Sequence, residues 1–313
     1  MARDMVAPFI LVPLYMYPLE QAWEPLFQAA RAHREVRFVA VVNPASGPGA
    51  EALPDQSYIA ALRRLADEPN IEAVGYVYCS YGARQPAAVC ADMEAYCGWR
   101  LDGQPVIGGV FFDEAPAGHD KVDWMHHLAR HAHQTWRAQH DAQHDAQHDA
   151  QHDAHDACPP VGETPAQDSK ALDSKALDSK ALVILNPGVA VPLAYFAHCH
   201  HVVVFEGSEA EWQRRCIDQP GLDPILRDHD ALSKAVAIIH STQQPPRRLH
   251  RLLSLFHNSS NKQHPACHAA HTLAQIRALG LMGVYLTDQL HGGYTRWPAA
   301  WMQLADAVAQ WQL

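Results

Sequence analysis

The residues best suited to chemistry in this sequence are two adjacent carboxylates, Asp113 and Glu114, at the end of an apolar run. The run 106–112 reads VIGGVFF, and such a short, continuous apolar segment is typical of a strand buried on both faces of a parallel sheet. Carboxylates in that position need polar partners or an open cleft, because burial alone favours their protonated forms. A single Asp would often only cap the following helix, but two consecutive acids favour a functional site.

Other polar side chains also follow apolar runs. Glu206 comes directly after the run 201–205 (HVVVF), and an isolated acid at a buried strand end is typical of functional sites. Asn43 and Asn186 each precede a proline, so a ligand contact and a turn-shaping role are equally compatible with them. His240 follows the run 235–239, where a hydrogen-bonded core histidine is the commoner case. The remaining candidates at the ends of apolar runs are Tyr15, Tyr17, Tyr78, Tyr81, Thr287 and Asp288.

This set of acids, amides and tyrosines, without a group of lysines, indicates a carbohydrate ligand rather than a phosphate. Amides and carboxylates hydrogen-bond to hydroxyls, and aromatic rings stack on the apolar faces of pyranoses. Two or three carboxylates at one site also suit glycoside hydrolysis, which uses an acid/base together with a nucleophile or a water-activating base. The segment 198–201 (HCHH) resembles a metal motif, but strand alternation sends its neighbouring side chains to opposite faces. We therefore expect no metal and no cofactor.

The elements that must position these residues alternate regularly along the chain. Eight short apolar runs alternate with segments of helical periodicity, and about 268 residues remain outside one insertion. This pattern predicts a single (β/α)8 TIM barrel, typically ~250 residues long, with its site at the C-terminal ends of the strands. An open doubly wound sheet is the alternative, although no Gly-x-Gly-x-x-Gly follows any run. The predicted strands are 8–18, 36–42, 73–80, 106–112, 182–185, 201–205, 235–239 and 283–286, and the main helices 19–33, 57–66, 86–99, 120–137, 268–279 and 298–310.

The insertion lies after the fourth predicted helix, at about 138–182. Ala-Gln-His-Asp occurs four times across 138–153, and Asp-Ser-Lys-Ala-Leu three times across 168–182. These repeats have no apolar face to bury, so we expect a solvated, disordered spacer that interrupts a single domain spanning 1–313. The segment contains nine acids and three lysines.

Composition limits the partners of the chain. The net charge of -10 argues against nucleic-acid binding, which needs a basic face. No segment is long and apolar enough to span a membrane, and no export signal is visible, so the sequence by itself indicates a cytoplasmic location without establishing it. A monomer is the separate expectation for the assembly. The seven cysteines include no Cys-x-x-Cys pair, which favours reduced, buried thiols.

Several motifs, taken in order, resemble the spherulin-4-like proteins, known as spherulation-specific family 4 and grouped with glycoside hydrolase family 135. They cover nearly the whole chain except 138–182. The matching segments are 12–15 (VPLY), 42–49 (VNPASGPG), 75–77 (GYV), 81–84 (YGAR), 109–114 (GVFFDE), 186–188 (NPG), 205–206 (FE), and Tyr294 with 297–298 (WP).

The resemblance implies a (β/α)8 fold and, as in characterised members, endo-hydrolysis of an α-1,4-linked polysaccharide that contains N-acetylgalactosamine. The acidic trio of the family would fall on Asp113, Glu114 and Glu206. Tyr294 joins the expected substrate-binding residues. Family members are commonly secreted, which differs from the expectation for this chain, and the repeats are not a family feature.

Within the trio we expect Glu206 to be the general acid/base, because its apolar neighbours should raise its pKa. Asp113 would be the nucleophile or would orient the acetamido group of the substrate. Glu114, turned away by strand alternation, would bond a sugar hydroxyl or hold Asp113. The alternatives are a non-catalytic glycan-binding, spore-coat or cell-surface protein on the same barrel, and a metal-dependent deacetylase with His/Asp ligands at the mouth. Carboxylates about 5–10 Å apart across one cleft would favour the hydrolase.

Overall fold

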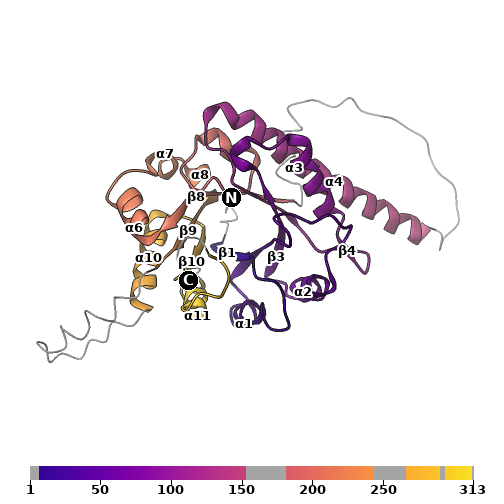
Figure 1. The fold of residues 1–313 in the computed structure, drawn as a ribbon, viewed down its shortest axis with the longest axis horizontal. Coiled ribbons are helices and arrows are strands. Elements are labelled where there is room, and N and C mark those ends of the chain that lie inside the picture. The colour runs from indigo at the N-terminus through magenta and orange to yellow at the C-terminus, as the bar shows by residue number, and fades with distance from the viewer. Residues whose placement is uncertain (1–6, 153–180, 243–265, 290–292, 312–313) are drawn as a thin grey trace, which may run out of the picture.

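Eight parallel strands close into a barrel in the order β1-β10-β9-β8-β7-β6-β3-β2 (Figure 1). The computed structural model describes residues 7–152, 181–242, 266–289 and 293–311. The prediction of a (β/α)8 barrel is confirmed, and each strand overlaps one of the eight apolar runs. The strands are β1 (Phe9–Leu14), β2 (Arg37–Val42), β3 (Ile71–Tyr78), β6 (Gly109–Asp113), β7 (Leu182–Leu185), β8 (His201–Ser208), β9 (Ala235–His240) and β10 (Gly283–Leu286).

Helices surround the barrel, and short ones fill the connection between β8 and β9 (Figure 1). The sequence pattern did not predict these short helices, nor the hairpin of β4 (Arg100–Leu101) and β5 (Gln104–Pro105). The longer helices are α1 (Glu24–Ala32), α2 (Gln56–Ala66), α3 (Pro86–Cys97), α4 (Val122–His152), α10 (Ala266–Leu279) and α11 (Trp301–Ala309), and the short ones are α6 (Glu209–Trp212), α7 (Asp223–Leu226) and α8 (His229–Lys234).

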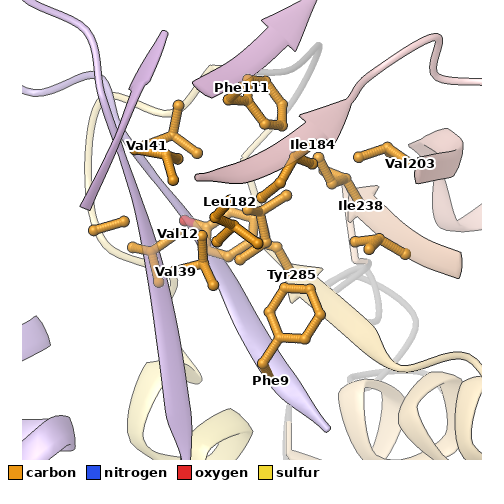
Figure 2. Close-up of a cluster of buried hydrophobic side chains, with 14 of the residues drawn as sticks. Phe9, Val12, Val39, Val41, Phe111, Leu182, Ile184, Val203, Ile238 and Tyr285 are labelled. Atoms are coloured by element: carbon orange, nitrogen blue, oxygen red, sulfur yellow. The ribbon is translucent and has the colours of Figure 1, made fainter. Parts of the chain in front are cut away.

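The barrel interior is packed with apolar side chains rather than open. Figure 2 shows Val12, Val39, Phe111, Ile184 and Tyr285 directed toward one another from five different strands. Such filling makes the barrel a solid core that can hold residues at its C-terminal end, here called the mouth.

Helix α3 packs closely on the outside of β3 through a glycine. A Cβ atom at Gly75 would lie 2.4 Å from the ring of Tyr96, so any larger residue would push the helix away. The hydroxyl of Tyr96 donates a hydrogen bond to the carbonyl of Val42 at 3.1 Å. These contacts tie α3 to the middle of β3 and to the end of β2.

Helix α4 is longer than predicted. The periodicity indicated an end at Arg137, but the helix continues to His152 and extends away from the barrel (Figure 1). The first repeat therefore does not begin a disordered spacer at residue 138. Alanine and glutamine are good helix formers, and extending an existing helix avoids the cost of nucleation. The second repeat lies mostly outside the described residues.

Strand β8 contains an irregularity that re-aims its last residues. Its pairing with β9 shifts register between Val203 and Phe205, which is the pattern of a β-bulge. Val203 points into the barrel (Figure 2), whereas the ring of Phe205 packs against Trp212 of α6 at a centroid distance of 5.2 Å. The extra residue thus turns Phe205 outward and Glu206 toward the inside.

Candidate active site at the mouth of the barrel

The centre of the mouth is an amide that bridges two carboxylates. The side-chain nitrogen of Asn186 donates to Oδ1 of Asp113 and to Oε2 of Glu206, each at 2.7 Å. Because both oxygens lie 2.7 Å from one nitrogen, they are separated by no more than twice that distance, 5.4 Å. Residues from β6, from the end of β7 and from β8 therefore meet in one place.

The orientation of this amide depends on the two acids. Asn186 is only 5% exposed, and its own carbonyl oxygen is buried without a partner among the described residues. A buried, unpaired acceptor costs about 1–3 kcal/mol. The amide is nevertheless held with its NH₂ group toward the carboxylates, since ionised carboxylates only accept hydrogen bonds.

Two tyrosines complete the hydrogen bonding of the pair. The hydroxyl of Tyr76, on β3, donates to Oδ2 of Asp113 at 2.7 Å. The hydroxyl of Tyr294 donates to Oε1 of Glu206 at 2.5 Å. Each carboxylate thus accepts one phenolic and one amide hydrogen bond, which fixes the rotation of both groups.

Tyr15 lies between these two tyrosines. Its ring meets those of Tyr76 and Tyr294 edge to face, with both centroid distances 5.5 Å. Burial, followed by the charges of Asp113 and Glu206, raises the pKa of Tyr15 well above its usual value. The phenol therefore remains protonated and can donate a hydrogen bond beside the carboxylates.

The surroundings of Glu206 raise its pKa above that of an ordinary glutamate. Burial raises the pKa of Glu206, although the hydrogen bonds from Tyr294 and Asn186 lower it, and the charge of Asp113 raises it further. Gly188, with φ +66°, accepts the Glu206 N–H through its carbonyl at 2.9 Å. A carboxyl group with a raised pKa is suited to donating a proton near neutral pH.

Glu114 occupies a strained turn rather than a regular strand position. Its φ is +49°, and its carbonyl accepts the Tyr81 N–H at 2.7 Å. Ser80 and Tyr81 also have positive φ values, 49° and 51°. Tyr81 is 67% exposed, and the pKa of its phenol is raised by burial and then by Glu114, Asp113 and Glu206. Residues in such backbone conformations cluster at functional sites, and this turn keeps Tyr81 and Glu114 beside the carboxylate pair.

Two predicted site residues, in the loops after β1 and β2, contact other protein groups near those loops. Oδ1 of Asn43 accepts the Gly47 N–H at 3.1 Å. This side-chain oxygen therefore shapes the turn after β2. Tyr17 is 46% exposed, and its ring meets that of Tyr58 edge to face at 5.5 Å. Tyr17 thus lies beside α2 rather than in the carboxylate group.

Three further predicted residues have other partners at the ends of their strands. The guanidinium of Arg84 covers the ring of Tyr78 at 4.1 Å. Nδ1 of His240 is 2.8 Å from the hydroxyl of Ser241. Both oxygens of Asp288 bond to the guanidinium of Arg296, at 3.1 and 2.7 Å, and one accepts the Ala299 N–H.

The pKa of Asp288 reflects that anchoring role. Burial alone would raise it, but the hydrogen bonds from Arg296 and from the backbone hold it below its usual value. The ion pair connects the end of β10 to the segment before α11. Its geometry therefore fits loop anchoring.

Sequence reasoning missed Tyr76 as a site residue. It selected Tyr78, at the visible end of the apolar run, although Tyr76 and Tyr78 share one side of the strand. The sequence feature that could have identified Tyr76 is a tyrosine inside a buried strand that lies next to the strand carrying Asp113. In the register between β3 and β6, Tyr78 pairs with Asp113 and Tyr76 with Phe111. The long side chain of Tyr76 extends from its own position to the carboxylate of Asp113, two residues further along the neighbouring strand.

The histidines of 198–201 lie away from the mouth, at the start of β8. Nδ1 of His200 accepts the Val183 N–H at 3.1 Å, and the ring of His201 packs on Phe9 at 4.3 Å. No group of three or more His, Cys, Asp or Glu side chains within the described ranges could hold a metal ion. Nor does any helix in those ranges have the length and apolar character to cross a membrane.

Comparisons with known proteins agree on one family. The model of "Spherulation-specific family 4" matches residues 9–308. Spherulin-4 of Physarum polycephalum is 36% identical over 122 residues, which cover 39% of this chain and 34% of that protein. The alignment therefore spans only about a third of this curated relative. The crystal structure of Aspergillus clavatus Sph3 in complex with GalNAc superposes with a TM-score of 0.68 at 25% identity, covering 98% of this chain and 100% of that one.

Proposed function

The chain belongs to spherulation-specific family 4, and from this premise we propose that it is a glycoside hydrolase whose carboxylate pair is Asp113 and Glu206. The observation that carries the proposal is the Asn186 bridge, which brings two acids from different strands within 5.4 Å of each other. The raised pKa of Glu206 and the aromatic walls of the mouth support it. The GalNAc bound to the Sph3 structure supports an aminosugar substrate.

The proposed substrate is an α-1,4-linked polysaccharide that contains N-acetylgalactosamine, cleaved internally. The carboxylate of Glu114 and the phenols of Tyr15 and Tyr81 have the polar groups that sugar hydroxyls and acetamido groups require. The ring of Tyr81, which is 67% exposed beside Glu114, supplies apolar surface for the face of a pyranose. The basic side chains near the mouth are bound within the protein, Arg84 by Asp92, Lys121 by the Gly82 carbonyl and Arg296 by Asp288, which suits a neutral polymer better than a phosphate.

The separation of the acids favours a retaining mechanism. Retaining glycosidases hold their two carboxyl groups about 5–5.5 Å apart, whereas inverting enzymes need about 6.5–9.5 Å to admit a water molecule. An upper limit of 5.4 Å between the facing oxygens of Asp113 and Glu206 agrees with the shorter range. The first product should therefore keep the α configuration.

In the first step, Glu206 gives its proton to the glycosidic oxygen while an oxygen of Asp113 bonds to C1 and the leaving sugar departs. In the second step, the ionised Glu206 takes a proton from water, whose oxygen bonds to C1 as the Asp113–C1 bond breaks. Direct attack by Asp113 is preferred to attack by the acetamido group. In an α linkage, the leaving oxygen and the C2 acetamido group occupy the same face of the ring, so the acetamido oxygen cannot attack from the opposite side.

Glu114 and Tyr81 would act on the bound sugar from one side of the pair. Their shared turn places a second carboxylate and an exposed phenol next to Asp113. We assign Glu114 to bonding a sugar hydroxyl and Tyr81 to contacting a neighbouring ring. Tyr76, Asn186 and Tyr294 are positioning residues, because they act through the two carboxylates.

The test is cleavage of α-1,4-linked N-acetylgalactosamine polymer by the whole chain and by two variants, Asp113→Asn and Glu206→Gln. Each variant should lose roughly two to four orders of magnitude in rate, because covalent or acid–base catalysis is removed. Glu51→Gln, the same change at an exposed acid between β2 and α2, is the matched control and should keep the parent rate. Circular dichroism and melting temperature should agree among all four proteins.

Two results would contradict the proposal. If both Asp113→Asn and Glu206→Gln keep more than about a tenth of the rate, the assignment of the acids is wrong. If the parent protein binds the polymer without cleaving it, a glycan-binding protein on the same barrel is the better description. An initial product with the β configuration, measured by NMR, would reject the retaining mechanism alone.

A further inference from the structure

Exposed apolar side chains are concentrated on one side of the mouth. Among the described residues, four of the six exposed large apolar side chains follow β1, β2 and β3, which are neighbours in the barrel. The remaining two, Leu193 and Ile217, follow β7 and β8. Contiguous exposed apolar groups mark interaction sites more often than isolated ones do. The four are Tyr17, Leu19, Leu53 and Tyr81.

A groove lies beside the first of these residues, between the segment after β1, helix α1 and helix α2. It has a volume of about 320 Å³. Leu19 and Trp23 give it apolar walls, and the polar side chains of Glu20, Gln56 and Ser57 line the same space. We call it the rim groove. Apolar walls with a few polar groups at the edge are typical of small-ligand sites.

The ring of Tyr17 next to this groove is held in a fixed position. It rests edge to face on Tyr58, which is only 3% exposed. Trp23 contacts Tyr58 from another side at 5.9 Å, and its ring nitrogen donates to the carbonyl of Met16 at 3.0 Å. The Leu19 N–H also donates to the Tyr17 carbonyl at 2.8 Å. An exposed aromatic ring that is already immobilised loses little entropy when a ligand stacks on it.

The rim groove and the carboxylate site share one stretch of chain, the segment that follows β1. Tyr15, which stands between Tyr76 and Tyr294, is two residues before Tyr17 in the same loop. Two residues of chain span at most about 7 Å, so the two tyrosines lie within reach of neighbouring units of one polymer. The hydroxyl of Tyr58 also reaches the carbonyl of Asn43, at the end of β2, at 3.4 Å.

We propose that the rim groove, with the ring of Tyr17, is a distal subsite for a sugar unit of the same polysaccharide whose scissile bond lies at Asp113 and Glu206. This proposal rests on the proposed function. The ring of Tyr17 stacks on a pyranose face, and Gln56, Ser57 and Glu20 accept or donate hydrogen bonds to its hydroxyls. The polymer then crosses the β1 side of the mouth, and long chains bind more tightly than short ones.

The test measures binding separately from cleavage. Calorimetry on the full chain carrying Glu206→Gln would compare an α-1,4-linked N-acetylgalactosamine octasaccharide with the disaccharide. Adding Tyr17→Ala should weaken octasaccharide binding about tenfold, equivalent to about 1.4 kcal/mol, and leave disaccharide binding unchanged. Tyr17→Phe keeps the ring and should retain the parent affinity.

Ile217→Ser is the matched control, because it removes another exposed apolar side chain three strands away, after β8. It should leave both affinities unchanged. An octasaccharide affinity within about twofold of the parent in Tyr17→Ala, or an equal loss for the disaccharide, would overturn the distal subsite. Cleavage by the protein with the Glu206 side chain intact tests the proposed function independently. Failure of the parent to bind any oligomer would contradict both proposals.

Discussion

At the scale of single residues, the site is defined by shared hydrogen bonds rather than by the acids alone. Asn186 serves Asp113 and Glu206 at once, and each acid has its own tyrosine. The hydrogen bonding of the two carboxylates is therefore nearly symmetric. The raised pKa of Glu206 follows first from burial. The assignment of Glu206 as the acid therefore depends on how its partners offset the cost of desolvation.

Removing one of those partners should shift the pH dependence of the reaction. The Tyr294 hydrogen bond lowers the pKa of Glu206, so Tyr294→Phe should raise it, by roughly one unit if a hydrogen bond to a charged group is worth about 1.5 kcal/mol. The general acid must be protonated, so kcat/KM falls as pH rises through this pKa. The alkaline limb of the profile should accordingly move to higher pH in Tyr294→Phe.

The control for that change is Tyr285→Phe, which alters a neighbouring phenol whose ring contacts Tyr294 at 5.9 Å. Its alkaline limb should coincide with that of the parent. A limb that stays in place, or moves to lower pH, in Tyr294→Phe would show that Glu206 does not act as the acid. The measurement is kcat/KM for polymer cleavage across a pH series.

At the scale of elements, the bulge in β8 and the length of α4 have separate consequences. The bulge orients Glu206 toward the interior. With regular alternation along β8, the side chain of Glu206 would point away from the interior. Helix α4 anchors the insertion to the barrel. Trp136 is buried and donates to the carbonyl of Ile107 at 2.9 Å, and Gln139 donates to the carbonyl of Cys97. Contact with the barrel therefore continues past Arg137.

Two deletions, each joined by a Gly/Ser linker, should separate the anchoring part of α4 from the rest of the insertion. Deleting 143–180 should leave the melting temperature within about two degrees of the parent, because long surface segments cost little closure entropy. Deleting 138–180 also removes Gln139 and His140, which lines a cavity beside Trp136. Losing about 1–2 kcal/mol there should lower the melting temperature by roughly 2–8 degrees.

Scanning calorimetry and polymer cleavage would be measured on both deletions. Equal melting temperatures for the two proteins would show that the contacts of Gln139 and His140 contribute nothing. A fall of roughly ten degrees or more on deleting 143–180 would mean that this segment packs on the barrel. Activity should be retained in either protein, because the mouth is formed by other segments.

At the scale of the whole molecule, histidines buried near the start of β8 make stability depend on pH. Burial lowers the pKa of His200 to about 4, with further contributions from His133, Arg37 and Lys234. Burial also lowers the pKa of His133, and lowers that of His201 well below its usual value. Neutral histidine is the form that the fold accepts, so protons bind preferentially to the unfolded chain.

The sign of the effect follows from that preference. Histidine in the unfolded chain has a pKa near 6.5, so the contribution of His200 is complete above about pH 6.5 and is lost as pH falls toward 4. The loss is about 3 kcal/mol at most for this residue. In His200→Asn, the side-chain oxygen can accept the Val183 N–H without titrating. The free energy of unfolding should therefore fall by about 2 kcal/mol less between pH 7 and pH 4.5 than it does in the parent.

Urea denaturation at the two pH values would measure this difference. His127→Asn, at an exposed position on α4, is the control and should follow the parent. The same pH dependence in His200→Asn and the parent would rule out His200 as a source of acid sensitivity. Cleavage at neutral pH should be unaffected by His200→Asn, since His200 lies at the start of β8, away from the mouth.

The sequence by itself was sufficient for the barrel and for the family. Strands buried on both faces produce continuous apolar runs, and eight of them alternating with helices leave few other folds. Because strand ends in such a barrel meet at one mouth, the order of residues also indicated that Asp113, Asn186 and Glu206 would come together. These are local patterns, and local patterns can be read without coordinates.

Only the tertiary structure decided which side chains share a hydrogen bond and which are occupied elsewhere. The extra residue in β8 determines which way Glu206 faces, and a bulge depends on pairing with the next strand rather than on the strand itself. Tyr76 reaches Asp113 because of the register between β3 and β6, while Asp288 is bound by Arg296 from a later segment. The end of α4 depended on helix propagation, which apolar periodicity does not report. These are interactions between residues far apart in the chain or cooperative effects along it, and neither leaves a mark in the spacing of apolar residues.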